Sequence, residues 1–320
     1  MEAMQAHASP SEPLLSDRAK RRLALWPTGP LPRALRVALR ERALRRLEIG
    51  KAARGIGIVV GHPKSGNTWL RTMLSRVYQL RHGLPETRVL KTDELHRLEP
   101  AIPSFCFTNG WYSYEAAIGE VLAPVHAECA IRRKPVVLLA RHPCDVAVSW
   151  HNQFTRRVSP AKRELINASL ARPIDPKKIT LWEFVMHSPV GLPSLIDFLN
   201  TWDRNLSQLP LTLRVSYEQL RAEPEATLER VASFFGLGFS REEIAEAVRF
   251  GSFENMRALE QSGRVKHGGL AQVDPGDPAT VKVRRGKVGG YRDDFTPEQV
   301  AEMERLVAEK LSPRFGYGAG

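Results

Sequence analysis

Short apolar runs alternate with segments of helical periodicity along the middle of this 320-residue chain. Residues 56–60 read Ile-Gly-Ile-Val-Val, and Leu70, Met73, Leu74 and Val77 then repeat at intervals of three and four residues. An uninterrupted β-branched run is typical of a strand buried on both faces, and the second spacing of a helix with one face on a sheet. The segment predicts a strand, a loop and a helix.

The same order recurs further along the chain. An apolar run over residues 135–140 leads into a helical pattern that continues through Trp150, and residues 211–215 form a third strand candidate. Helices are predicted over residues 224–235 and 241–250, and Thr296 supplies the cap of a final helix. Strands that alternate with helices predict an α/β fold, a mostly parallel sheet with helices on both faces, in a single domain.

The first residues have a different character. Residues 1–30 contain several prolines and few periodic apolar positions, so we expect a flexible or loosely attached arm before a domain over residues 31–320. Residues 33–54 alternate Arg and Lys with Leu and Ala, which predicts a basic amphipathic helix. We expect its charges to form a solvated face, and contact with a membrane surface or with nucleic acid stays open.

The composition narrows the class of protein. A formal charge of +12 favours anionic ligands in general. No run approaches the roughly 20 apolar residues that span a bilayer, and the first 15 residues lack the apolar stretch of a secretory signal. The three cysteines, Cys106, Cys129 and Cys144, have neither disulfide-framework nor zinc spacing. These observations predict a soluble cytoplasmic protein without a metal.

A phosphate-binding loop is predicted between the first strand and its helix. Residues 61–68 read Gly-His-Pro-Lys-Ser-Gly-Asn-Thr, and backbone N–H groups at such a helix start favour an anion. The two glycines have the spacing of a Walker A loop, but Asn67 stands where that motif requires lysine, and Lys64 lies inside the loop instead. This difference disfavours a nucleotide kinase.

The string over residues 63–70, Pro-Lys-Ser-Gly-Asn-Thr-Trp-Leu, resembles the P-K-S-G-T-T-W loop of sulfotransferases that use 3′-phosphoadenosine 5′-phosphosulfate (PAPS). The resemblance implies a P-loop-like fold, PAPS as the co-substrate, 3′-phosphoadenosine 5′-phosphate (PAP) as the product, and no metal. It also implies that Lys64, Ser65, Gly66, Asn67, Thr68 and Trp69 bind the co-substrate, with the loop at the 5′ phosphosulfate. Asn67 departs from the usual threonine.

Two later segments agree with this resemblance. Residues 141–149, Arg-His-Pro-Cys-Asp-Val-Ala-Val-Ser, are similar to the family's R-x-P-x-D-V-A-V-S, which implies that Arg141 and Ser149 hold the 3′ phosphate. Arginine suits that task because its planar group donates charge-assisted hydrogen bonds. Residues 284–295 resemble the family's late R-K-G segment. The residues that the resemblance places over the 3′ phosphate there are Arg284, Arg285 and Gly286.

Aromatic residues complete the implied donor site. Tyr217, in a segment like the family's Y-E-D, and Phe253, in one like S-F-x-x-M, would line the adenine together with Trp69. Each of the two also has the ordinary alternative of a place in the hydrophobic core.

The resemblance assigns catalytic roles as well. Lys64 would neutralise charge on the bridging oxygen of the donor, and Ser149 would restrain Lys64 until the acceptor binds. A hydroxyl acceptor needs a base, which the family commonly supplies from a K-T-H segment after a short strand. His126 is the nearest equivalent, although no Lys-Thr precedes it, and His96 and His151 are lesser candidates.

The acceptor is not readable from the sequence. We expect a small molecule or glycan with a hydroxyl or amine, held by variable loops near residues 105–115, 153–180 and 261–282, and a homodimer is open. Two other functions stay open. A P-loop kinase would need magnesium, and a nucleic-acid-binding protein would explain the net charge, although no recognised binding motif is present.

Overall fold

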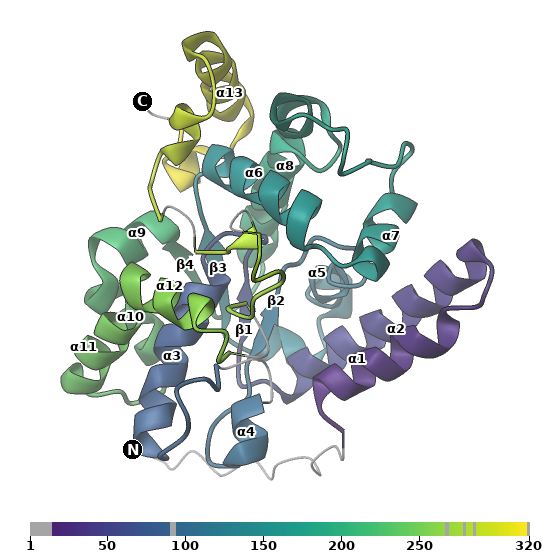
Figure 1. Ribbon diagram of the computed structural model, residues 1–320. Coiled ribbons are helices and arrows are strands. Elements are labelled where there is room, and N and C mark those ends of the chain that lie inside the picture. The colour runs from purple at the N-terminus through teal and green to yellow at the C-terminus, as the bar shows by residue number, and fades with distance from the viewer. Residues whose placement is uncertain (1–14, 90–93, 266–268, 278–279, 284–285, 319–320) are drawn as a thin grey trace.

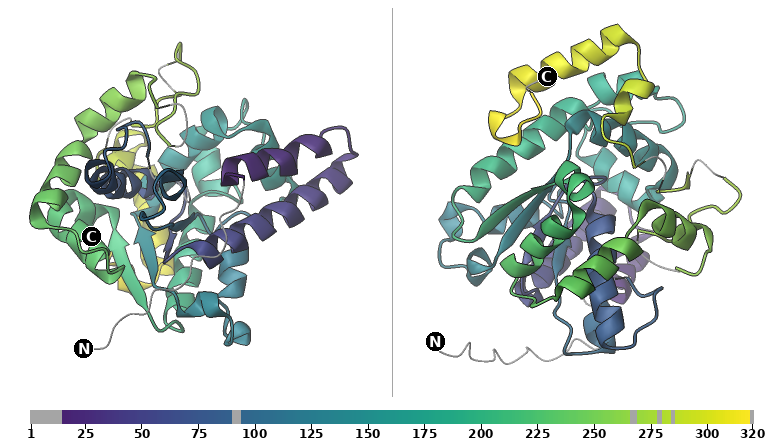
Figure 2. Two further views of the ribbon diagram at one scale, coloured as in Figure 1. Left: turned by 90° about the horizontal axis from the view of Figure 1, so that it is seen from below. Right: turned by 90° about the vertical axis from the view of Figure 1, so that its left-hand side faces the viewer.

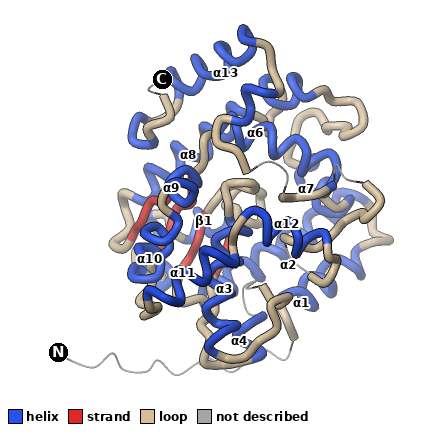
Figure 3. Tube along the Cα trace, turned by 60° about the vertical axis from the view of Figure 1, so that its left-hand side comes forward, coloured by secondary structure: helices blue, strands red, loops and turns tan. Residues whose placement is uncertain are grey.

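A four-stranded parallel sheet lies at the centre of the computed structural model, which describes residues 15–89, 94–265, 269–277, 280–283 and 286–318 (Figures 1 and 3). The strand order is β2-β1-β3-β4. The strands are β1 (Ile58–Val60), β2 (Cys106–Thr108), β3 (Val136–Ala140) and β4 (Thr212–Ser216). The predicted α/β fold with a parallel sheet is confirmed.

Alternate residues of the central strands enter separate hydrophobic cores on the two faces. In β3, Val136, Leu138 and Ala140 belong to one core, whereas Val137 and Leu139 belong to the other. Strands β1, β2 and β3 are fully buried, which explains why their sequences contain apolar residues at every position rather than at every second one.

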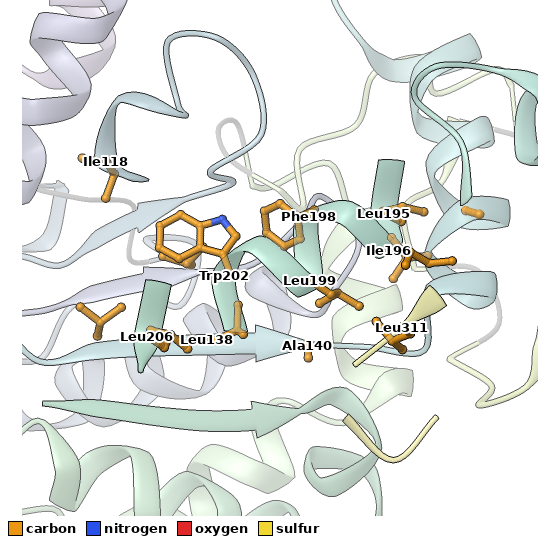
Figure 4. Close-up of a cluster of buried hydrophobic side chains, with 14 of the residues drawn as sticks. Ile118, Leu138, Ala140, Leu195, Ile196, Phe198, Leu199, Trp202, Leu206 and Leu311 are labelled. Carbon is orange, nitrogen blue, oxygen red and sulfur yellow. The ribbon is translucent and has the colours of Figure 1, made fainter. Parts of the chain in front are cut away.

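Helices cover both faces of the sheet. The first core packs α6, α8 and α13 over the sheet, and Figure 4 shows Phe198, Leu199 and Trp202 of α8 above Leu138 and Ala140 of β3. The second core is formed by α3, α10 and α11. The helices on the sheet are α3 (Asn67–Arg81), α6 (Pro143–Asn152), α8 (Leu192–Leu206), α10 (Pro224–Phe234), α11 (Arg241–Phe250) and α13 (Pro297–Lys310).

The remaining helices lie at the edges of this core or in the connections. They are α1 (Asp17–Leu25), α2 (Arg33–Arg54), α4 (Glu94–Leu98), α5 (Ala117–Val121), α7 (Pro160–Ala168), α9 (Tyr217–Ala222) and α12 (Phe253–Gln261). Among the described helices, none is both long and apolar enough to cross a membrane.

The N-terminal region differs from the expected loose arm. Residues 17–25 form α1, and α1 and α2 pair as a helical hairpin at one side of the molecule (Figures 1 and 2). Arg54 of α2 donates to Asp17 at 2.8 Å, and Arg21 donates to the Tyr114 hydroxyl at 3.0 Å. Part of the range predicted as an arm is therefore folded onto the domain. The apolar pattern did not predict this because charged side chains make these contacts.

The basic helix predicted over residues 33–54 is confirmed as α2, which buries Leu44 and Ala52 against the domain. Strands also form in the regions predicted at residues 56–60, 135–140 and 211–215. Helices form in the regions predicted at 224–235 and 241–250. Strand β2 was not predicted. It has three residues and lies within the range 105–115 that the sequence assigned to an acceptor loop.

The connectivity of the sheet positions a binding site. From β1 the chain crosses to β2 on one side, whereas β3 lies on the other side of β1. In open parallel sheets, ligands bind beyond the carboxyl ends of the strands at the point where the crossover direction changes. The loop after β1 and the residue after β3, Arg141, both lie at this point.

Candidate active site

A cavity of about 710 Å³ opens at the carboxyl ends of the strands. Its walls come from segments far apart in the sequence. The predicted residues that line it are Lys64, Gly66, Asn67, Thr68, Trp69, Arg141, Ser149, Tyr217, Phe253 and Gly286. The structure therefore brings most of the predicted site together in one place.

The loop after β1 has the backbone conformation of a tight anion-binding turn. Gly66 has a φ of 109°, and Lys64 has a φ of 82°, which is uncommon for a residue with a side chain. Asn67 donates from Nδ2 to the Gly61 carbonyl at 3.0 Å, so its side chain closes the loop upon itself. Ser65 is buried and donates its backbone N–H to the His62 carbonyl at 3.0 Å. Ser65 does not line the cavity, in contrast to the prediction.

Arg141 connects three parts of the site. It follows β3, and its guanidinium donates to the Lys64 carbonyl at 3.4 Å and to the Lys287 carbonyl at 3.1 Å. The same group lies 4.2 Å from the centre of the Tyr217 ring. The phosphate loop, β3 and the late loop thus meet at one cation that also faces the cavity.

A buried carboxylate holds the late loop in place. Asp145, one turn into α6, lies 3.5 Å from Arg141 and accepts the backbone N–H groups of Gly289 at 2.9 Å and Tyr291 at 3.1 Å. Tyr291 is buried, and its ring stacks on His142. Tyr291 therefore anchors the late loop against α6.

Aromatic rings form another wall of the cavity. Trp69 and Tyr217 meet edge to face with their centroids 5.5 Å apart. Phe253 lies against Gly286, where an added Cβ would come within 2.7 Å of the Phe253 ring and where φ is 60°. Glycine at this position lets the late loop approach the ring. Such faces suit a planar heterocycle. Arg284 and Arg285 lie outside the described residues.

The sequence model of the sulfotransferase domain matches residues 57–314, which is most of the chain and includes the whole sheet and every described helix from α3 to α13. The chain belongs to the sulfotransferase family. The resemblance drawn from the sequence motifs is thereby confirmed, and so is the prediction that the chain is an enzyme of this class.

Two relatives and one solved structure illustrate the match. Cytosolic sulfotransferase 12 of Arabidopsis thaliana is 26% identical over 79% of this chain and 76% of its own length. Flavonol 4′-sulfotransferase of Flaveria chlorifolia is 26% identical over 78% of this chain and 77% of its own length. Mouse sulfotransferase SULT7A1, solved with PAP, aligns with a TM-score of 0.54 at 19% identity, over 82% of this chain and 86% of its own.

The predicted base does not lie in this sulfotransferase's cavity. His126 is exposed, and Arg132 links the neighbouring Pro124 carbonyl to that of Gln208, close to the amino ends of β3 and β4. His126 therefore lies at the opposite end of the strands from Lys64, and the prediction that it is the base in this cavity was wrong. Neither His96 nor His151 lines the cavity, and no histidine occurs among the lining residues of the described chain.

The short strand that the K-T-H segment should follow is β2. It ends with Phe107 and Thr108, and Asn109 comes next and lines the cavity. Asn109 donates to both oxygens of the buried Glu115, at 3.2 and 3.0 Å. An amide that is held by a carboxylate thus takes the place expected for histidine, and sequence spacing alone did not reveal it because β2 was read as a loop.

Several lining residues were not singled out as site residues. All three ranges expected to bind the acceptor contribute to the walls, and Arg71 of α3 adds a cation beside Phe107, 4.3 Å from its ring centre. Among the lining residues that the predicted site lacked are Arg71, Asn109, Tyr112, Asp145, Trp150, Gln153, Arg157, Ser159, Lys162 and Lys282. Asp145 belongs to the motif over residues 141–149, but the others are scattered over helices and loops without a motif, so their signal in the sequence is weak.

Beneath the loop, His62 is buried in an apolar cage. Its ring meets Trp111, Trp150 and Phe198 edge to face, with centroids 5.2 to 5.7 Å away. Burial lowers the pKa of the His62 imidazole to about 3, so the ring is neutral near pH 7. His62 supports the loop from below and does not face the cavity.

Among the described residues, no three histidine, cysteine, aspartate or glutamate side chains gather as a metal site requires. The expectation that no metal takes part stays a prediction.

Proposed function

We propose that this sulfotransferase transfers a sulfuryl group from PAPS to a hydroxyl or amine of a small molecule or glycan and releases PAP. One observation carries the proposal. Lys64 in the loop after β1 and Arg141 after β3 line a single cavity, connected through the Lys64 carbonyl. A nucleotide with phosphate groups at both its 5′ and 3′ positions would use both cations at once.

The donor roles follow from this arrangement. The first turn of α3, from Asn67, would hold the 5′ phosphate, with Lys64 at the bridging oxygen. Arg141 and Ser149 would hold the 3′ phosphate, joined by Gly286, Arg284 and Arg285. The adenine would lie among the rings of Trp69, Tyr217 and Phe253.

In the proposed reaction the acceptor atom forms a bond to sulfur while the bond from sulfur to the bridging oxygen breaks. The electron pair of that bond remains on the departing phosphate, so negative charge grows on the bridging oxygen. Lys64 stabilises this charge, and such preorganised electrostatic stabilisation contributes several kcal/mol in a dry site. The acceptor loses its proton to water or to a nearby base.

The described walls contain no histidine to take this proton. We therefore propose a readily ionised acceptor hydroxyl, such as a phenol, because a more acidic hydroxyl requires less help from a base. A relative named for a flavonol, whose 4′ hydroxyl is phenolic, supports this choice.

Lys64→Ala tests the proposed reaction. We expect it to abolish PAPS turnover with an acceptor found by screening phenols, other alcohols and amines, while PAP affinity changes only a few-fold. The exposed Lys310→Ala serves as a control for loss of one positive charge. Normal turnover by Lys64→Ala would remove Lys64 from catalysis.

The kinase alternative is disfavoured at two positions. Asn67 uses its side chain to close the loop, and no lysine follows Gly66. The residue after β3 is Arg141, where a Mg²⁺-binding kinase would have use for a carboxylate. The nucleic-acid alternative has only the net charge in its favour.

We further propose that the protein is cytoplasmic, that it forms a homodimer, and that the α1 and α2 hairpin makes peripheral contact with a membrane. Trp26, between these helices, is 83% exposed, and Leu23 and Leu35 are also exposed near basic side chains. Aromatic and basic residues together suit an anionic lipid surface. Sedimentation with anionic vesicles tests the membrane contact, and analytical ultracentrifugation tests the dimer.

A further inference from the structure

A lysine from a distant loop reaches the start of the phosphate-binding helix. The Lys282 ammonium group donates to the Thr68 hydroxyl at 2.6 Å. Thr68 is the second residue of α3, and both residues line the cavity. The contact is enclosed by Gly269, because a Cβ added there would clash with the Thr68 hydroxyl and lie 2.7 Å from the Lys282 nitrogen.

The loop that carries Lys282 is fixed by hydrogen bonds rather than by the lysine itself. The backbone N–H groups of Lys282 and Val283 donate to the buried Glu260 carboxylate of α12 at 2.8 and 2.9 Å. Arg157 donates to the same carboxylate at 3.2 Å. The direction of the Lys282 side chain towards Thr68 is thus set by its backbone.

The charges around Lys282 are mostly of its own sign. Arg71 of α3, Arg157 of the short helix η4 (Gln153–Arg157) and Lys162 of α7 act against its positive charge, and Glu260 acts in its favour. Burial and these cations lower the pKa of Lys282 to about 7. A concentration of cations beside a helix N-terminus is unfavourable unless an anion joins it.

We propose that Lys282 binds the 5′ phosphate of the donor beside Thr68. This inference rests on the proposed function, since it assigns a further residue to the donor site. It separates two roles. Lys64 in the loop stabilises charge on the bridging oxygen during transfer, whereas Lys282, in contact with Thr68, increases the affinity for the nucleotide.

The proposal makes donor affinity depend on pH with a definite sign. With a pKa of about 7, part of the Lys282 side chains would be neutral in the free protein near pH 7.5, and the bound phosphate would favour the charged form. Binding would then consume a proton, so affinity declines as the pH rises from 7 to 8 and above. The phosphates of PAP, whose second ionisation lies near pH 6, are constant in this range.

Calorimetric titration with PAP, 5′-AMP and 3′-AMP tests the assignment. Lys282→Met should weaken PAP and 5′-AMP by about 10- to 100-fold, as expected for a lost charge-assisted contact, and leave 3′-AMP nearly unchanged. Repeating the titrations in buffers of different ionisation enthalpy should show proton uptake near pH 7.5 in the wild-type protein and its loss in the variant.

Two further variants keep the result interpretable. Lys282→Arg should bind PAP tightly without the pH dependence, because arginine stays charged. The exposed Lys310→Met should behave like the wild-type protein, and thermal unfolding confirms that each variant is folded.

The outcomes separate this inference from the function on which it rests. Failure of the wild-type protein to bind PAP would contradict the proposed function. PAP binding by Lys282→Met with wild-type affinity and proton uptake would overturn only the role of Lys282. So would a variant with normal PAP binding whose KM for the acceptor alone is raised, because that result would assign Lys282 to the acceptor.

Discussion

At the residue scale, the site depends on one backbone conformation and the cation that supports it. Lys64 adopts a φ of 82°, a conformation that costs a side-chain-bearing residue of the order of 1 kcal/mol. Arg141 donates to the carbonyl of this residue and also faces the cavity. The same guanidinium therefore stabilises the loop and remains available to an anion at the adjacent strand end.

Arg141→Ala should change nucleotide selectivity. We expect PAP to bind about 2 to 3 kcal/mol more weakly and 5′-AMP to lose much less, because the lost contact is a charge-assisted one to the 3′ phosphate. Calorimetric titration with both nucleotides measures the difference. Equal losses for PAP and 5′-AMP would show that Arg141 acts only by supporting the loop.

His62 should make stability depend on pH. The pKa of its imidazole is about 3 in the folded chain and near 6.5 when unfolded, so below pH 6.5 the unfolded chain binds a proton that the folded chain excludes. This group alone should cost about 2 kcal/mol of unfolding free energy between pH 6.5 and pH 5.

Urea unfolding of the wild-type protein and of His62→Phe at both pH values isolates this contribution. A phenyl ring keeps the apolar contacts of the cage but does not titrate, so the variant should lose less stability on acidification than the wild-type protein. Identical pH dependence in the two proteins would mean that His62 is not excluded from protonation when folded.

The motifs correctly predicted site residues that lie close together in the sequence. They did not predict residues that only tertiary contacts bring to the site. Lys64, Gly66, Thr68 and Trp69 lie in one loop and helix, so their spacing fixes their relation, and they line one cavity. The prediction of His126 as the base failed because its distance along the sequence from Arg141 does not determine at which end of the strands it lies. Asn109 and Lys282 belong to segments whose positions are set only by tertiary contacts.

At the scale of elements, a buried ion pair joins η4 to α12 beside the loop that carries Lys282. Arg157 of η4 is 5% exposed and Glu260 of α12 is 1% exposed, with 3.2 Å between them. Arg157 also donates to the carbonyls of Ala271, at 3.2 Å, and Thr280. Burial lowers the pKa of Arg157, in keeping with a cation held away from water. The described parts of the loop over 269–283 are thereby attached to α12 and η4.

Arg157→Met should reduce the free energy of unfolding by about 3 to 5 kcal/mol, because it leaves the Glu260 carboxylate buried without its cation. Adding Glu260→Gln should restore part of this stability, since the amide removes the charge and keeps an oxygen for the backbone N–H groups. Chemical unfolding measures both variants. A double variant that is as unstable as the sum of its single changes would contradict the pairing.

Strand and helix predictions succeeded where apolar residues form a continuous run or follow a regular period. Strand β3 is such a run, and β3, α10 and α11 form where expected. Strand β2 reads Cys-Phe-Thr and has no comparable run, and α1 is attached through charged side chains, so neither could be read from the apolar pattern. Tertiary contacts, rather than local sequence preference, determine the secondary structure of such segments.

At the scale of the whole molecule, the parallel sheet brings these parts together. The strand order places the carboxyl ends of β1 and β3 side by side, with Lys64 after one and Arg141 after the other. The formal charge of +12 provides a general attraction for anions, but the strand order determines where a doubly phosphorylated nucleotide fits. The sequence predicted the parallel sheet because β1, β3 and β4 and the segments that follow them carry their own signals, whereas β2 and the strand order were not predicted.

The most direct test of this account is calorimetric titration of the purified protein with PAP and, separately, with ATP plus Mg²⁺, in the absence of any acceptor. The account predicts tight PAP binding that is unchanged by Mg²⁺ and that weakens markedly when 5′-AMP, which lacks the 3′ phosphate, replaces PAP. Selective binding of Mg²⁺ and ATP without PAP binding would contradict it and would favour a kinase.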